Sequence, residues 1–271
     1  MIMDFIPIVD RVAFIAATLY DIFHVPSSPY SVLPYAYYVS GFGEIMYTGY
    51  YIEKHDLWEE LIHRILGLEY RGSNELDKGT ELIRRIEIPF WKEISESLVE
   101  IHPRVSRLYR ALKQDIISTI GKVFGFQKLF KRIYVIYGFS PLPKSLYGSM
   151  LYWSNDYVIV AIYVNDMHEP EKVIDIMIHE VLHGLMRLNN IELRDDIEEL
   201  LIDISCPEGY LSKILGLSME TKVDEIAEKY EDLAELASMA ISYYENKIYD
   251  EDLDIIKWIT SYINDRRLPI I

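Results

Sequence analysis

Residues 170–188 read PEKVIDIMIHEVLHGLMRL and form the most informative stretch of the chain. A proline at the start, with the acidic Glu169 directly before it, is typical of a helix N-terminus. At 3.6 residues per turn, His179 and His183 lie one above the other on the same helix face. We therefore expect a helix from about Pro170 to Leu188 that presents two imidazoles on one side.

The two histidines and the glutamate between them, Glu180, have the spacing of a metal site. Two neutral imidazoles one helical turn apart can reach one Zn²⁺. A carboxylate next to that metal can take a proton from a water that the metal activates. The pattern predicts His179 and His183 as zinc ligands and Glu180 as the catalytic general base. The alternative is a pair of surface histidines with ordinary hydrogen bonds.

The segment before this helix has the pattern of a small sheet. Arg132–Tyr137 (RIYVIY) is rich in β-branched and aromatic residues, as strands are. Two further strand-like runs, Ser149–Ser154 and Tyr157–Val164, are separated by Asn155-Asp156, a dipeptide that suits a tight turn. We therefore expect a small, mainly antiparallel sheet.

The rest of the chain is predicted to be helical. In the first half, residues 4–23 have the apolar spacing of a buried helix, and helical periods continue over 55–68 and 75–120. After the histidine helix, the apolar spacing predicts three further helices, at about residues 194–205, 223–240 and 251–264.

This order of elements indicates an α+β fold that is mostly α. A helical N-terminal domain of residues 1–128 would precede a second domain of residues 129–271. The second domain would hold the small sheet, the histidine helix and the C-terminal helices.

Residues 155–205 resemble the zincin metallopeptidases. The signature of that family is two histidines and a glutamate on an active-site helix, preceded by an edge strand that pairs with the substrate backbone. The run Tyr157–Val164 is in the place of that strand, where main-chain hydrogen bonds would hold a peptide. The resemblance implies a zincin-like fold for residues 129–271.

The third metal ligand decides the branch of the zincins. Metzincins have a glycine and a third histidine soon after the motif, but Met186 and Asn189 occupy those positions here. No histidine follows His183, so the third ligand is expected to be acidic or to come from upstream, where His168 is the nearest candidate.

Gluzincins, of which thermolysin is the familiar case, take a glutamate from a second helix, typically followed four residues later by an aspartate that orients a ligand histidine. The helix predicted to begin at Arg194 reads RDDIEELLIDISC, in which Glu198 and Glu199 compete. Glu199 and Asp203 are four residues apart and share the face opposite the apolar one. The resemblance and the spacing favour Glu199 as ligand and Asp203 as the orienting carboxylate; the alternative is a solvated acidic stripe.

The resemblance implies a zinc-dependent peptidase that hydrolyses peptide bonds of a peptide or protein substrate with metal-activated water. The alternative is a catalytically inactive zincin-like scaffold that acts as an interaction or regulatory protein. The N-terminal helical domain would be accessory: a built-in inhibitor that covers the cleft, or a packing or substrate-selecting unit.

Composition excludes several other classes of protein. The formal net charge of −16 disfavours nucleic acid as a partner. The single cysteine, Cys206, cannot form an internal disulfide and fits a reducing compartment. The longest uncharged stretch, Val25–Gly43, contains three prolines and is unlike a membrane helix. We expect a cytoplasmic protein without a membrane span, and the many Ile, Glu and Tyr are typical of a thermophile.

Overall fold

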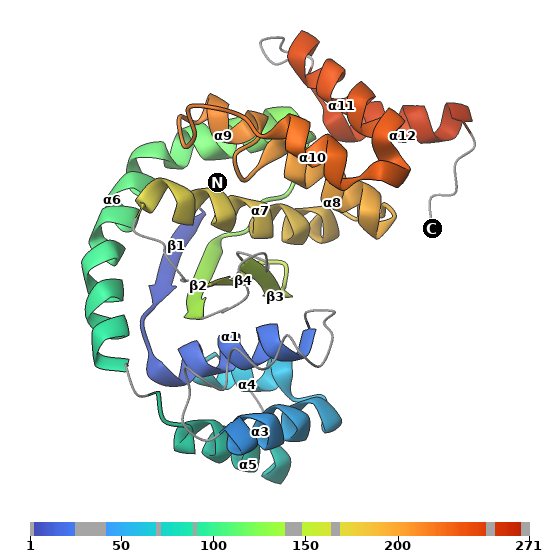
Figure 1. Ribbon diagram of the computed structural model, residues 1–271. Coiled ribbons are helices and arrows are strands. Elements are labelled where there is room, and N and C mark those ends of the chain that lie inside the picture. Colours follow the sequence, from blue (N-terminus) through green and yellow to red (C-terminus); the bar gives the residue numbers. More distant parts are fainter. Residues whose placement is uncertain are drawn as a thin grey trace.

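A computed structural model describes most of the chain, namely residues 3–24, 42–68, 72–88, 91–138, 148–163, 169–247 and 253–266. These residues form many helices around one four-stranded sheet (Figure 1), which confirms the mostly helical α+β class. The candidate ligand His168 and the predicted strand end Val164 lie outside the described residues.

The sheet is mixed. Its strands β1 (Asp4–Ile8), β2 (Arg132–Gly138), β3 (Gly148–Trp153) and β4 (Tyr157–Tyr163) lie in the order β1-β2-β4-β3. The pairs β1–β2 and β2–β4 are parallel and only β3–β4 is antiparallel, so the prediction of a mainly antiparallel sheet is wrong. Strands β2 and β4 are buried on both faces and read as continuous apolar runs, which is the pattern of parallel strands.

The edge of the sheet next to β4 is formed by β3. Strand β4 lies between β2 and β3, so the prediction that the Tyr157–Val164 run is the edge strand is also wrong. Within the described residues, β3 pairs with β4 alone. A bulge at Leu151 interrupts this pairing, because Met150 lies opposite Val160 and Tyr152 opposite Ile159.

The N-terminus also differs from the prediction of one helix over residues 4–23. Strand β1 comes first, and helix α1 (Arg11–His24) begins after Asp10, whose Oδ1 accepts hydrogen bonds from the backbone N–H groups of Val12 and Ala13. The strand is short and its apolar residues run on into those of the helix, so a periodicity argument merges the two elements.

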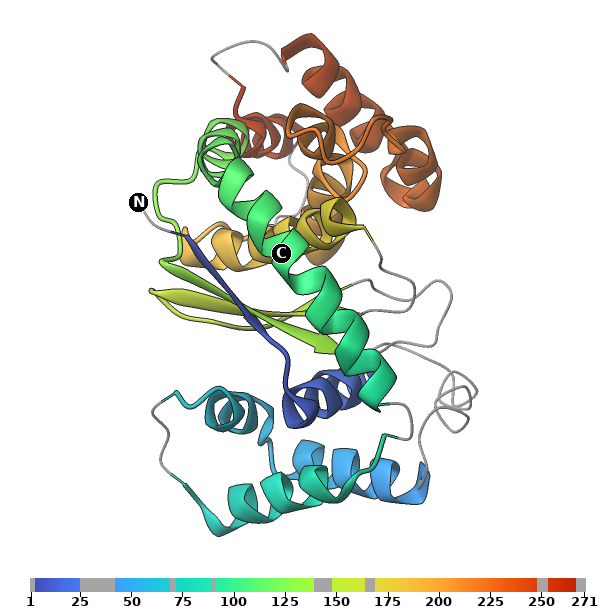
Figure 2. The same cartoon turned by 90° about the vertical axis from the view of Figure 1, so that its left-hand side faces the viewer.

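The helices cover both faces of the sheet (Figures 1 and 2). One face carries α1, with the helices α3 (Phe42–Lys54), α4 (Trp58–Ile65) and α5 (Asn74–Arg85) packed around it. The other face carries α7 (Pro170–Leu188). The long helix α6 (Trp91–Phe124) runs beside β1 and contacts α7.

The C-terminal part of the chain lies beyond α7, away from the sheet (Figure 1). Its elements are α8 (Asp195–Ser205), α9 (Tyr210–Ile214), α10 (Val223–Lys229), a 3₁₀ turn at Glu231–Leu233, α11 (Ala234–Lys247) and α12 (Ile255–Arg266). Among the described residues, no helix is both long enough and apolar enough to cross a membrane.

One hydrophobic core crosses the predicted domain boundary at residue 128. The core between the sheet and α7 includes Phe14 of α1 and Val105 of α6 as well as Val135 of β2 and Leu182 of α7. Strand β1 pairs with β2 across the same boundary. A cut at residue 128 would therefore divide a shared sheet and core, and the two-domain division stays a prediction.

Helix α7 approaches the sheet closely at Gly184. A Cβ atom at this position would lie 3.1 Å from the Phe130 ring and 3.1 Å from Val158 Cγ2. Both neighbours are fully buried, so they have little room to move. The absence of a side chain at Gly184 thus sets how close the histidine-bearing helix can lie to β4.

We expect Gly184→Val to lower the free energy of unfolding by about 1–3 kcal/mol, because the new methyl groups overpack the contact with Phe130 and Val158. Urea unfolding measures this change. Gly121→Val in α6 is the matched control, since a Cβ there meets no atom within 4 Å, and it should change the stability by no more than about 0.5 kcal/mol. Equal effects of the two substitutions would contradict the close approach.

Candidate metal centre

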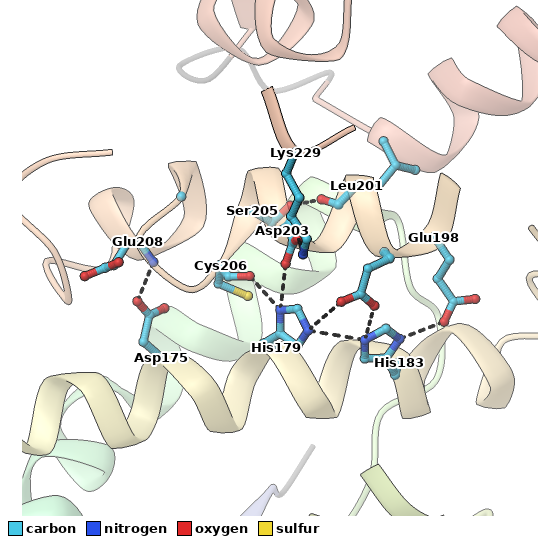
Figure 3. A network of polar contacts seen from close by, with 12 residues as sticks. Asp175, His179, His183, Glu198, Leu201, Asp203, Ser205, Cys206, Glu208 and Lys229 are labelled. Carbon is cyan, nitrogen blue, oxygen red and sulfur yellow. Dashed lines mark hydrogen bonds and ion pairs between the residues drawn. The ribbon is translucent and has the colours of Figure 1, made fainter. Parts of the chain in front are cut away.

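Two histidines of α7 and one glutamate of α8 converge on a single point. His183 Nε2 lies 3.3 Å from His179 Nε2 and 3.2 Å from Glu199 Oε2, and His179 Nε2 lies 3.7 Å from Glu199 Oε1 (Figure 3). One donor atom from each residue falls within 4.8 Å of the others, so this group could hold a metal ion.

The position of Glu199 follows from how α8 packs on α7. The apolar face of α8, formed by Ile197, Leu200, Leu201 and Ile204, is buried in the core. This packing leaves Glu199 partly exposed, with 31% of its side chain accessible, beside the two Nε2 atoms. Glu199 therefore lies on the Nε2 side of the histidines, whereas Glu198 lies on the Nδ1 side of His183. The role of Glu199 as a metal ligand stays a prediction.

The imidazole of His179 is oriented by a backbone carbonyl. His179 Nδ1 lies 2.8 Å from the carbonyl oxygen of Cys206. A carbonyl only accepts, so Nδ1 carries the hydrogen and the Nε2 lone pair faces Glu199. Asp203, the predicted orienting carboxylate, lies farther away, with Oδ1 3.7 Å from Nδ1. The sequence gives no signal for a carbonyl acceptor, and this one was missed.

Asp203 forms hydrogen bonds with the last residue of a third helix, α10, and with the residue that follows it. Its Oδ2 accepts a hydrogen bond of 2.7 Å from Lys229 Nζ and another of 2.7 Å from the Tyr230 hydroxyl. These partners come from the end of α10, which is distant in sequence. Asp203 therefore lies near His179, as predicted, but its strongest contacts point away from the imidazole.

His183 is oriented by Glu198, the glutamate that was predicted to compete for the metal. His183 Nδ1 lies 2.8 Å from Glu198 Oε1, and Arg187 donates to the other oxygen, Oε2, at 2.6 Å. Each of the two neighbouring glutamates thus contacts a different nitrogen of the same imidazole. Arg187 was not singled out by the sequence, although it follows His183 by four residues on α7.

Glu180 lies beside the two histidines, under the start of the edge strand. It is 6% exposed, and burial raises the pKa of its carboxyl group, an effect that the charges of His179 and His183 partly offset. A Cβ on Gly148 would lie 2.9 Å from Glu180 Oε1, so the bare backbone of β3 comes close to this carboxylate. The carboxyl group of Glu180 therefore lies against β3, which pairs with β4 alone among the described residues.

The charges of the site favour a cation. Burial lowers the pKa of His183, but its hydrogen bonds with Glu198 and Glu199 outweigh this and raise the pKa to about 10. Burial raises the pKa of Glu199, but the hydrogen bond with His183 and the charges of His179, His183 and Lys229 together outweigh this and lower it. The carboxylates thus attract positive charge to this point, and a metal that binds neutral imidazole would release the proton of His183.

Asp175 ties the chain after α8 to α7. Its Oδ1 accepts a hydrogen bond from the Ser212 hydroxyl at 2.6 Å, and its Oδ2 accepts one from the backbone N–H of Glu208 at 2.8 Å. This segment begins at Cys206, whose carbonyl orients His179. Burial raises the pKa of Asp175 to about 6, although both hydrogen bonds oppose the shift.

Comparisons with protein families, with curated proteins and with solved structures found no match to this chain. The function therefore has to be argued from the geometry and the chemistry of the site itself.

We expect Asp175→Asn to change how stability depends on pH. The folded pKa of Asp175 (about 6) lies above the unfolded value of about 3.9. Its protonated form therefore contributes stability that is fully present below about pH 4 and is lost as the pH rises through about 6.

The unfolding free energy of the wild type minus that of the variant should fall by about 2–3 kcal/mol between pH 4 and pH 7.5. Chemical unfolding of the chelator-treated proteins measures it. Asp115→Asn, at an exposed site of α6, supplies the baseline for removing a carboxylate. A difference that stays constant or grows with pH would show that Asp175 is not held as a buried acid.

Proposed function

We propose that this chain is a zinc-dependent peptidase of the gluzincin type. The observation that carries the proposal is the convergence of His179, His183 and Glu199 with Glu180 beside them. Two imidazoles and one carboxylate form the ligand set of catalytic zinc sites that keep one coordination position open. The donors come from two packed helices, so little rearrangement is needed to bring them onto one ion.

The donor set fits zinc better than the harder cations. Calcium and magnesium prefer six or more oxygen ligands, whereas two nitrogens and one carboxylate suit zinc. Both Nδ1 atoms are engaged with acceptors, which leaves both Nε2 atoms to bind the metal once His183 has released its proton. When bound, zinc would supply the Lewis acidity that lowers the pKa of a water at its open position and polarises a carbonyl.

Glu180 is proposed as the general base. It follows His179 directly on the helix and therefore lies beside the ligands, not among them. Burial raises the pKa of its carboxyl group, which brings its proton affinity closer to that needed near neutral pH. The carboxylate can accept the proton of the attacking water and later pass it to the leaving amine.

The proposed substrate is an extended peptide that adds to β3. Within the described residues this strand has one free edge, and its first residue, Gly148, lies against Glu180. A peptide paired with this edge would be held by main-chain hydrogen bonds, largely independent of its sequence. We thus assign to Gly148–Trp153 the substrate-pairing role that the sequence predicted for the run Tyr157–Val164.

We expect Glu180→Gln to lower kcat for peptide cleavage by about 10²–10⁴-fold, because the amide cannot accept the proton of the attacking water. Zinc content should stay at the wild-type level, since Glu180 is not among the convergent donors. The measurement is cleavage of a quenched fluorescent peptide library together with metal analysis. Glu171→Gln, at an exposed position of the same helix, is the control. Cleavage that persists in the Glu180 variant would refute the proposed base.

We expect His179→Ala and Glu199→Ala each to weaken zinc affinity by more than about 100-fold, because each removes an atom that binds the metal. Loss of a residue that only hydrogen-bonds to a ligand costs about 10–100-fold. The wild type should gain about 2.7 kcal/mol of stability at a zinc concentration of 100 times Kd, and the variants should not. Chelator competition and thermal unfolding with and without zinc measure both effects. Unchanged affinity in the Glu199 variant would remove Glu199 from the ligand set.

A further inference from the structure

The side of His183 that faces away from the convergent donors carries a short chain of charged groups. Glu198 accepts a hydrogen bond from His183 Nδ1 on one oxygen and from Arg187 on the other, at 2.8 and 2.6 Å. The Glu198 side chain is 2% exposed, whereas that of Arg187 is 35% exposed. A buried carboxylate therefore connects the imidazole to a cation at the surface.

This chain fixes which nitrogen of His183 faces the site. An ionised carboxylate only accepts hydrogen bonds, so the nitrogen that faces Glu198, Nδ1, carries a hydrogen, and Nε2 is the nitrogen that offers a lone pair once His183 is neutral. That Nε2 is the atom 3.2 Å from Glu199 and 3.3 Å from His179 Nε2. The orientation of Glu198 thus determines whether His183 can serve as a ligand.

Glu198 in turn depends on Arg187. A carboxylate with so little exposure is stable in its charged form only when it is paired and hydrogen-bonded. Within the described residues, Glu198 forms ion pairs with His183 and Arg187, and of these two Arg187 is the one that is always charged. Without the guanidinium, Glu198 Oε2 loses its 2.6 Å hydrogen bond, and nothing else in the described part of the chain holds the carboxylate in the orientation that meets His183.

The two histidines differ in this respect. The acceptor for His179 is the carbonyl of Cys206, which no side-chain cation needs to hold. Lys229 pairs with Asp203, but Asp203 lies 3.7 Å from His179 and is also bound by Tyr230. Removing Lys229 therefore leaves the acceptor of His179 in place, whereas removing Arg187 disturbs the acceptor of His183.

We propose that Arg187 is a positioning residue that acts through Glu198 to hold His183 in the orientation that binds metal. The inference rests on the proposed zinc site and adds a residue to it. It requires that Arg187 and Glu198 act as one unit, so that removing both costs no more than removing Glu198 alone.

The test is the Zn²⁺ dissociation constant, measured by chelator competition, for Arg187→Met, Glu198→Gln, their double variant and Lys229→Met. We expect the first two to weaken binding by about 10–100-fold, and the double variant to bind no more weakly than Glu198→Gln. Lys229→Met is the matched control, since it also removes a cation from an outer carboxylate, and should change the constant by no more than about threefold. Arg187→Lys keeps the positive charge and should therefore bind Zn²⁺ more tightly than Arg187→Met does.

Wild-type affinity in Arg187→Met, or losses that multiply in the double variant, would overturn the proposal. So would an Arg187→Met protein whose chelator-treated form is unfolded by circular dichroism, since Arg187 would then support the fold as a whole. The proton signal of His183 Nδ1–H in the NMR spectrum gives a second readout, which should be protected in the wild type and exchange rapidly in Arg187→Met. If the wild type takes up no zinc, the proposed function fails, while this signal still decides the role of Arg187.

Discussion

The pairing of buried polar groups between α7 and α8 is the constraint on which the rest of this structure depends. His179 of α7 and Glu198 of α8 are each less than 10% exposed and lie against a largely apolar core. Polar groups removed from water to this extent are costly unless they are hydrogen-bonded or bind a cation. The close fit of α7 to the sheet at Gly184 and the apolar face of α8 bring the two helices into the position in which that pairing is satisfied.

The resulting site is organised in two layers of charge. Around the point where His179, His183 and Glu199 meet, the outer carboxylates Glu198 and Asp203 are each bound to a cation of their own, Arg187 and Lys229. These ion pairs nearly cancel in charge. The inner carboxylates, Glu180 and Glu199, remain to balance a divalent ion. The donors that could hold a metal ion are therefore oriented without one: His179 by the Cys206 carbonyl and His183 by Glu198.

The sequence alone was sufficient to single out the residues that converge at the candidate site, and insufficient for much of what orients them. The histidine spacing and the Glu199–Asp203 offset follow from helix geometry, and the structure brings these residues together. The strand β1 and the parallel direction of β2 and β4 were missed because a short apolar run looks alike in a helix and in a doubly buried strand. No local sequence pattern encodes the tertiary contacts that bring the Cys206 carbonyl to His179, or Lys229 and Tyr230 to Asp203.

The most direct test of the central claim is a crystal structure of the zinc-loaded protein, with the metal located by anomalous scattering. The account predicts zinc bound by His179 Nε2, His183 Nε2 and a Glu199 oxygen at about 2.0–2.2 Å, with water in the remaining position, and Glu198 still on His183 Nδ1. A fourth protein ligand would contradict it, for instance the Cys206 sulfur at about 2.3 Å, because a closed site is structural and leaves no position for a reacting water.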